Sequence, residues 1–170
     1  MELWLVRHPE PEVRPGICYG RLDLAVSKAA IASSLQKLCL PAFDRLRSSP
    51  ALRCRLLAER LHAAPIEDVA LQERHFGEWE GVSWEAIDRS ALDAWAADPW
   101  DFAPPGGESA RMLRERVRAA VAVDVALGGV AVWVTHQGVI RATAGLLLNL
   151  PDKEWMTLQV GFGEAIVYKT

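Results

Sequence analysis

Two apolar segments, one near each end of the chain, each finish in a histidine. The first covers residues 3 to 6 and is followed by Arg7-His8, and the second covers residues 130 to 135 and is followed by His136. Buried strands of a parallel sheet are near-continuous hydrophobic runs, and open α/β sheets bind ligands in the crevice outside the carboxyl ends of their strands. We therefore expect two parallel strands that place both imidazoles in one crevice, which is the geometry of a reaction centre.

Length and composition predict the number of domains and limit the kinds of partner. The chain has 170 residues, of which 51% are hydrophobic, and a formal net charge of -3. It can bury one full core, so residues 1 to 170 are expected to form a single domain. Without a basic excess, neither nucleic acid nor a membrane surface is expected as a partner, and an anionic ligand must be met by a local arginine cluster. The absence of a long apolar run and of a signal-peptide start favours a cytoplasmic location. The protein is expected to be a monomer or a homodimer.

The remaining segments alternate between strand and helix patterns. Ser27 is a plausible N-cap, prolines and glycines separate the elements, and Gly128-Gly129 end the longest helix. This alternation predicts an α/β three-layer sandwich, with a mostly parallel mixed sheet and helices on both faces. The expected strands cover residues 2 to 7, 42 to 47, 66 to 71 and 130 to 136, with a hairpin of strands at 156 to 161 and 165 to 169. The expected helices cover residues 27 to 38, 50 to 61, 83 to 97, 109 to 127 and 138 to 148.

The longest predicted helix carries an apolar stripe. Leu113, Val117, Val121 and Val125 recur at every fourth residue. Positions four apart lie on the same side of a helix. We expect this stripe to pack on the sheet.

Charged and titratable side chains follow the predicted strands. Arg7 and His8 follow the first strand, Arg53 lies in the first turn of the helix after the second, Glu73 follows the third, and His136 follows the last. Because the carboxyl ends of parallel strands meet at one edge, these side chains are expected to converge. Two arginines at one site indicate a phosphate ligand, since the guanidinium fork matches phosphate oxygens and stays charged.

A histidine and a carboxylic acid complete a set of groups for phosphoryl transfer. A histidine in such a site is either a nucleophile or a stabiliser of charge, and Glu73 can supply a proton to the leaving group. The helix predicted after His136 would add the backbone N–H groups of Gln137 and Gly138. The residue types alone do not decide which histidine is the nucleophile.

Six sequence blocks follow one another across residues 3 to 141. They are Leu5-Val6-Arg7-His8, Gly20-Arg21-Leu22-Asp23, Ser48-Ser49-Pro50-Ala51-Leu52-Arg53-Cys54, Leu71-Gln72-Glu73 with Phe76-Gly77-Glu78-Trp79-Glu80-Gly81, Pro105-Gly106-Gly107-Glu108-Ser109, and Val134-Thr135-His136-Gln137-Gly138-Val139-Ile140-Arg141. In type and order these blocks resemble the histidine phosphatase superfamily, the phosphoglycerate mutase-like enzymes. Two of them, Gly-Arg-x-Asp and Phe-Gly-x-Trp-Glu-Gly, in so short a chain are most similar to the α-ribazole phosphatases, which dephosphorylate the nucleotide loop of cobalamin.

The resemblance implies a role for each candidate residue. His8 would attack phosphorus in line and become a phosphohistidine, and Glu73 would protonate the departing alcohol and then deprotonate the hydrolytic water. A neutral imidazole is available near pH 7, and the arginines supply the charge stabilisation, so no metal and no other cofactor is expected. The substrate would be a small phosphorylated molecule. The residues implied to bind it are Arg7, Arg53, His136, Gln137 and Arg21.

The chain departs from the family pattern beside His8. Pro9 stands where the family usually has glycine, and Pro11 where it usually has serine or threonine. One backbone N–H and one hydroxyl near the phosphate are therefore missing, which puts the local geometry in question.

Structural roles remain open for other residues. Arg21 can contact substrate or form a loop salt bridge with Asp23 or another carboxylate. The tryptophans between residues 79 and 100 can stack on a substrate base, although core packing is the favoured interpretation. Arg141, His62 and His75 are expected to be structural or surface residues. The tryptophans are Trp79, Trp84, Trp95 and Trp100.

Other kinds of function fit parts of the sequence. A cysteine phosphatase needs Cys-x5-Arg, which occurs from Cys54 to Arg60 and from Cys39 to Arg45, but without a glycine-rich loop. Together with Cys18 these cysteines form no CxxC pair and are expected to be reduced thiols. A metallohydrolase needs clustered ligands, and the histidines show no such spacing. A broad-specificity or sugar phosphatase, a phosphoglycerate mutase and a non-catalytic phosphate-binding module remain as alternatives, although the short stretch from 82 to 107 favours hydrolysis over transfer.

Overall fold

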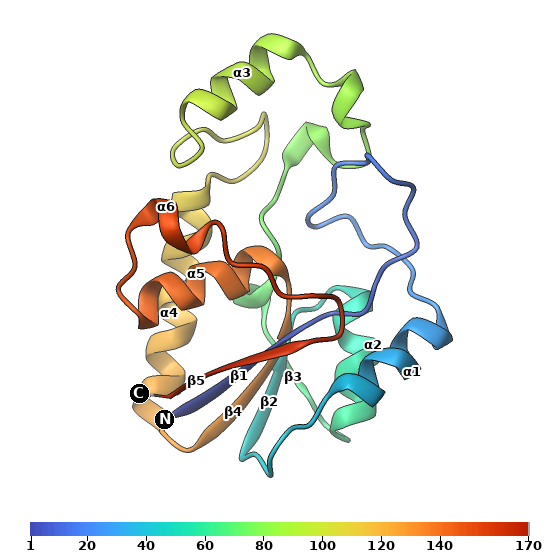
Figure 1. The fold of residues 1–170 in the computed structure, drawn as a ribbon, viewed down its shortest axis with the longest axis vertical. Helices are drawn as coiled ribbons and strands as arrows, with labels where there is room; N and C mark the ends of the chain where they lie inside the picture. Colours follow the sequence, from blue (N-terminus) through green and yellow to red (C-terminus); the bar gives the residue numbers. More distant parts are fainter. Residues whose placement is uncertain (170) are drawn as a thin grey trace.

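The computed structural model describes residues 1–169, apart from the side chains of residues 152 and 153. A five-stranded sheet in the order β3-β2-β4-β1-β5 forms its centre (Figure 1). The strands β1 to β4 are parallel to one another, and β5 is antiparallel to β1. They cover β1 Glu2–Arg7, β2 Arg45–Ser48, β3 Ile66–Glu67, β4 Val130–Thr135 and β5 Ala165–Lys169.

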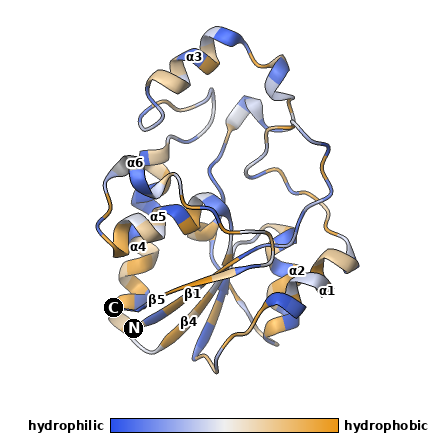
Figure 2. Cartoon of the chain, in the orientation of Figure 1, coloured by the Kyte–Doolittle hydropathy of each residue, from blue (hydrophilic) through white to orange (hydrophobic). Residues whose placement is uncertain are grey.

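Helices cover both faces of the sheet, which confirms the expected α/β sandwich. α1 (Lys28–Lys37) and α2 (Leu52–Leu61) pack on one face, and α4 (Ala110–Leu127), α5 (Gln137–Leu147) and the short α6 (Asp152–Trp155) lie on the other (Figure 1). Ser27 caps α1 as expected, since its side chain accepts from the Ala30 N–H at 3.0 Å. The sheet separates two apolar cores, one under each layer of helices. Figure 2 shows that the central strands and the adjacent helices carry many hydrophobic residues.

The apolar stripe of α4 leaves the sheet before its end. Leu113, Val117 and Val121 are buried, but Val125 is 47% exposed, so its predicted packing is wrong. Because the helix has 3.6 residues per turn, each step of four residues rotates about 40° too far. Asp124 faces inward instead, where its carboxylate accepts from the Trp133 indole at 2.7 Å and pairs with arginines of β2.

Several predicted elements differ in length or in partner. The third strand stops at Glu67, because the side chain of Asp68 accepts from the Ala70 N–H at 2.8 Å and opens a 3-10 turn over Val69–Leu71. The second strand starts at Arg45 rather than at residue 42. The helix after it starts at Leu52 rather than at residue 50, and the Leu52 N–H donates to the side chain of Asp23, from a distant loop, at 2.8 Å.

Two further predictions are wrong. The helix expected over residues 83 to 97 is a 3-10 turn at Trp84–Ala86 followed by α3, Arg89–Ala97, because Asp88 caps a new start. The expected hairpin does not form: of its two strands only β5 is present, and β5 pairs with β1.

A third apolar cluster lies away from the sheet, at the α3 end of the molecule. Trp79, Trp84 and Trp95 pack in it around Cys18, with Trp84 and Trp95 stacked at 5.6 Å between ring centroids. Core packing of these rings is thus confirmed. Trp100 instead contacts Trp155. Within residues 1–169, no helix is both long and apolar enough to cross a membrane.

Candidate active site

The register of β1 and β4 brings the two histidines together. Arg7 lies opposite Thr135 in the sheet, so His8 and His136 leave it at the same level. Their ring centroids are 5.0 Å apart, and both side chains are buried. The pair of histidine-ending runs therefore converges at the carboxyl edge of the sheet.

The backbone of Pro9 fixes the ring of His8. The Nδ1 of His8 lies 2.7 Å from the Pro9 carbonyl oxygen, and only a protonated Nδ1 can donate to it. In a neutral ring the Nε2 lone pair is then free to act as a nucleophile. The contact uses the carbonyl of Pro9 and not its missing N–H, so proline at this position preserves it.

Acid is expected to destabilise the folded chain from about pH 6.5 downward. Burial, with the charges of Arg53 and Arg7, lowers the pKa of His8 from 6.5 to about 3, and burial lowers the pKa of His136 well below 6.5. Both rings stay neutral when folded, whereas the unfolded chain binds protons on them below its own pKa. The free energy of unfolding therefore falls as the pH drops from 6.5 toward 3, by up to about 1.4 kcal/mol per pH unit for each histidine.

Urea denaturation at pH 7 and pH 5 measures this effect. A His8→Gln variant, which keeps one of the two buried rings, should lose less stability between these pH values than the wild type. Equal losses in the two proteins would contradict the burial of a neutral His8.

Arg53 joins a loop to the second histidine. Its fully buried guanidinium donates to the carbonyls of Gly20 at 2.6 Å and Leu22 at 2.9 Å, and its Nη2 lies 3.3 Å from Nδ1 of His136. Because arginine only donates, that Nδ1 is the acceptor, and Nε2 of the neutral ring carries the proton. This Nε2 donates to Oγ of Ser49 at 2.8 Å. Ser49 was not among the predicted site residues, although it directly follows β2 in a block matched to the family.

The two predicted phosphate arginines each keep a donor without a partner. Arg7 donates from Nη1 to the Val160 carbonyl at 2.7 Å, and its guanidinium lies 3.9 Å from the centroid of the Phe162 ring. The Nε atoms of Arg7 and Arg53 are buried, and no acceptor for either occurs in the described part of the chain. A buried unpaired N–H is costly, and ionised oxygens such as those of a phosphate are the acceptors that guanidinium donors bind most strongly.

Glu73 lies at the N-terminus of α5. One carboxylate oxygen accepts from the Gly138 N–H at 3.0 Å and the other from the Arg74 N–H at 2.9 Å. A Cβ on residue 138 would lie 2.2 Å from the carboxylate, so this approach requires glycine. The Gly138 N–H, predicted as a phosphate donor, is here bound to the candidate acid.

Gln137 and Arg141 hold the segment that precedes β5. The Gln137 side chain donates to the Leu158 carbonyl at 2.8 Å and accepts from the Val160 N–H at 3.1 Å. Arg141 donates to the same Leu158 carbonyl at 2.8 Å. Substrate binding by Gln137 stays a prediction, and its side chain here supports the backbone that Arg7 contacts.

Glu80 fastens the loop that Arg53 contacts. Its carboxylate accepts at 2.9 Å from the backbone N–H groups of Gly20, Arg21, Leu22 and Phe76. Burial alone would raise the pKa of Glu80, but these hydrogen bonds lower it below its usual value. One carboxylate thus joins two loops that are far apart in the sequence.

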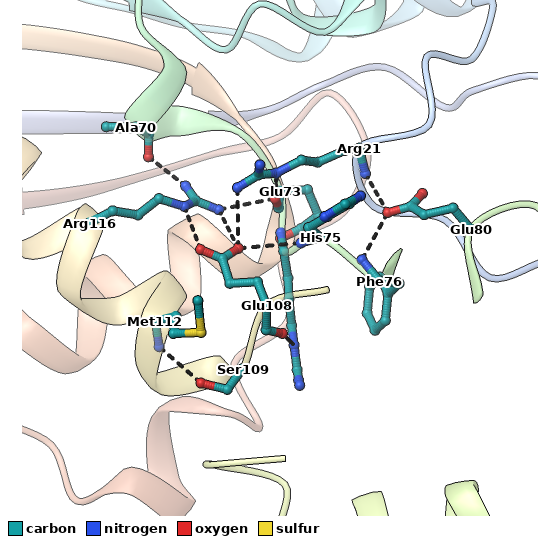
Figure 3. Close-up of polar contacts among 11 residues, drawn as sticks. Arg21, Ala70, Glu73, His75, Phe76, Glu80, Glu108, Ser109, Met112 and Arg116 are labelled. Carbon is teal, nitrogen blue, oxygen red and sulfur yellow. Dashed lines mark hydrogen bonds and ion pairs between the residues drawn. The ribbon is translucent and has the colours of Figure 1, made fainter. Parts of the chain in front are cut away.

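Arg21 pairs with a carboxylate other than Asp23. Its Nη2 lies 3.5 Å from Glu108, and its Nε donates to the Glu73 carbonyl at 3.3 Å (Figure 3). The side chain also lines a cavity of about 200 Å³ together with Ser49, Glu73 and His136. Substrate contact by Arg21 remains a prediction.

A second cavity is also lined by Glu73. It has a volume of about 230 Å³, and Arg141 and Gly138 form part of its wall. Its aromatic lining residues are Tyr19, Phe76, Trp95 and Trp155. The candidate acid therefore lines two cavities, one of which is largely aromatic.

The cysteine alternative is not favoured by the structure. Cys54 is fully buried in α2, and burial raises the pKa of its thiol to about 12, whereas a nucleophilic cysteine needs a lowered pKa. Cys39 is exposed, in the connection before β2. Among the residues that the structure describes, no cluster of histidine, cysteine and acidic side chains could hold a metal ion.

Comparison with known proteins agrees with this geometry. The sequence model of the histidine phosphatase superfamily (branch 1) matches residues 3–169, and the chain belongs to this superfamily. The glucosyl-3-phosphoglycerate phosphatase of Mycobacterium tuberculosis H37Rv is 32% identical, over 96% of this chain and 82% of that protein. The chain is thus a phosphatase of this class.

Solved structures share the fold. The mycobacterial glucosyl-3-phosphoglycerate phosphatase has a TM-score of 0.83 at 28% identity, over 98% of this chain and 88% of that chain. A phosphoglycerate mutase from Thermus thermophilus has a TM-score of 0.78 at 34% identity, over 98% and 92%. The phosphoglycerate mutase-like fold is therefore confirmed.

Proposed function

We propose that this phosphatase is a phosphomonoesterase that works without a metal through a phosphohistidine on His8. The Nε2 lone pair attacks phosphorus and the P–O ester bond breaks, while the protonated Glu73 gives its proton to the departing alcohol. Water then attacks the phosphorus, Glu73 takes its proton, and the P–N bond breaks to release inorganic phosphate. Arg7 and Arg53 stabilise the charge that develops on the phosphoryl oxygens.

One observation carries this proposal. The ring of His8 is held through Nδ1 by the Pro9 carbonyl, 5.0 Å from His136, at an edge where the buried Nε atoms of Arg7 and Arg53 find no acceptor within residues 1–169. An oriented neutral imidazole beside unpaired guanidinium donors suits in-line attack on a phosphate.

Trapping the intermediate tests the mechanism. The enzyme is mixed with substrate under single-turnover conditions and quenched in alkali, and the adduct is located by mass spectrometry. An acid-labile, alkali-stable phosphate on His8 is expected. Its absence would overturn the mechanism while leaving membership of the superfamily intact.

Replacing Glu73 by glutamine is expected to lower kcat/KM selectively for substrates with poor leaving groups. An alkyl alcohol needs a proton as it departs, and loss of general acid catalysis costs about 10²- to 10⁴-fold. A nitrophenolate leaves as a stable anion, so kcat/KM for p-nitrophenyl phosphate should change little. For each substrate kcat/KM reports on the steps up to and including alcohol release. An unchanged kcat/KM with an alkyl phosphate would show that Glu73 is not the acid.

For the alcohol itself we propose α-ribazole, released from its 5′-phosphate. The sequence blocks support this substrate, and so does the aromatic cavity beside Glu73, whose walls suit a planar heterocycle.

Glucosyl-3-phosphoglycerate is a second candidate substrate, because relatives about 30% identical across most of this chain are named for its hydrolysis. Phosphate release from both compounds, from phosphoglycerates, from sugar phosphates and from nucleotides distinguishes them. A preference of at least about tenfold in kcat/KM, or about 1.4 kcal/mol, for α-ribazole 5′-phosphate is expected. Equal rates across the panel would reject it in favour of a broad-specificity phosphatase.

A further inference from the structure

Arg116 of α4 holds the main chain that carries Glu73. Its Nη1 donates to the Ala70 carbonyl at 2.7 Å, and its Nη2 donates to the Glu73 carbonyl at 3.0 Å (Figure 3). Arg21 donates to the same Glu73 carbonyl at 3.3 Å. Both lone pairs of this oxygen are therefore bound by guanidinium groups from separate parts of the chain.

Glu108 orients these arginines. Its carboxylate binds Arg116 through two contacts, at 2.8 Å to Nε and 3.0 Å to Nη2, and also lies 3.5 Å from Arg21. Glu108 is only 6% exposed, so its charge is held in place by these partners rather than by bulk water. A bidentate pair fixes the direction of both groups.

The backbone of Glu108 is joined to the residues that follow Glu73. Its N–H donates to the His75 carbonyl at 2.8 Å, and its carbonyl accepts from Nε of Arg74 at 2.8 Å. Residues on both sides of Glu73 are thus held by one short segment at the start of α4.

We infer that Glu108 and Arg116 form a positioning unit that sets the direction of the Glu73 carboxyl group. The carboxylate itself has only the Gly138 and Arg74 N–H groups as donors among the described residues, so a backbone rotation at Glu73 would carry it away from the leaving group. Displacements of about 1 Å can cost about a hundredfold in rate. This inference rests on the proposed role of Glu73 as the acid.

The test compares leaving groups in Glu108→Gln and Arg116→Met. In each variant, kcat/KM for an alkyl phosphate should fall by about 10- to 100-fold, and that for p-nitrophenyl phosphate by less than about threefold. The double variant should be no slower than the slower single variant, because the two residues act as one unit. Both substrates are measured on the same preparation, so partial unfolding lowers the two values of kcat/KM by the same factor and leaves their ratio unchanged.

Asp124→Asn is the matched control. Like Glu108, Asp124 is a buried acidic residue that binds two arginines. It lies near the C-terminus of α4, whereas Glu108 precedes its N-terminus, and its arginines belong to β2. Its loss should lower the melting temperature without changing the ratio between the two substrates. An equal loss of both rates in Glu108→Gln and Arg116→Met, as from instability alone, would overturn the inference. If Glu73→Gln shows no selectivity for leaving groups, the proposed acid fails instead.

Discussion

Turnover is expected to fall by at least about 10⁴-fold when His8 is replaced by alanine, because the covalent route is then lost. Neither of two other nucleophilic residue types close to His8 in the structure is placed to take over: Nε2 of His136 is bound to Ser49, and the Cys54 thiol is buried with a raised pKa. The same variant should form no phosphohistidine in the trapping experiment. Steady-state phosphate release and mass spectrometry of the quenched protein provide the two readouts.

His62→Ala is the control for this substitution. His62 is exposed at the end of α2, and among the described residues its ring contacts the Ala64 N–H and the Phe43 ring, neither of which belongs to the candidate active site. Its replacement should leave turnover and the adduct unchanged. An acid-labile adduct that persists in His8→Ala, on any residue, would move the nucleophile elsewhere.

Arg53→Ala is expected to cost at least about a hundredfold in kcat/KM, as for the loss of one preorganised donor to a transition-state oxyanion. Arg53 is fully buried, and its Nε has no acceptor in the described chain. The loss should be similar for alkyl and nitrophenyl phosphates, because both develop the same charge on phosphorus. This equality separates a phosphate ligand from an acid or its positioning residues.

Arg55→Ala provides the comparison within the same helix. Arg55 is part-exposed and lies 3.8 Å from Glu67, a weak surface pair. Its replacement should change neither rate. A loss in Arg53→Ala that depends strongly on the leaving group would contradict a role in charge stabilisation.

The sequence predicts the strand ends better than the contacts made there. The hydrophobic runs before His8 and His136 locate the reaction edge, because burial on both faces forces continuous apolar strands. Ser49 could not be paired with His136 in this way, since 87 residues separate them and only the sheet order brings them together. Family blocks supply Arg53 and Glu73, whose local patterns alone would fit a surface helix and a solvated strand end.

The local sequence pattern also does not show which strand a given strand pairs with. The residues of β5 alternate well enough to predict a strand, but the partner is β1, more than 150 positions away, and not the neighbouring segment. Short apolar runs carry no information about which edge they join. The loop before β5 is wrongly predicted as a strand. Its backbone groups bind the side chains of Arg7 and Gln137 instead of a neighbouring strand, and these partners lie far away in the sequence.

Glu80 and Glu108 bracket a segment whose sequence can change without moving the candidate catalytic residues. The Glu80 carboxylate fixes residues 20 to 22 against Phe76, and Glu108 secures the chain again where it returns to α4. Residues 82 to 104, which carry α3 and most of the third apolar cluster, run between these two anchors. Insertions or exchanges there would change the wall of the aromatic cavity that Trp95 lines, while the two anchors keep residues 20 to 22 and the segment around Glu73 in place. A change of substrate preference therefore does not require a change in the proposed reaction.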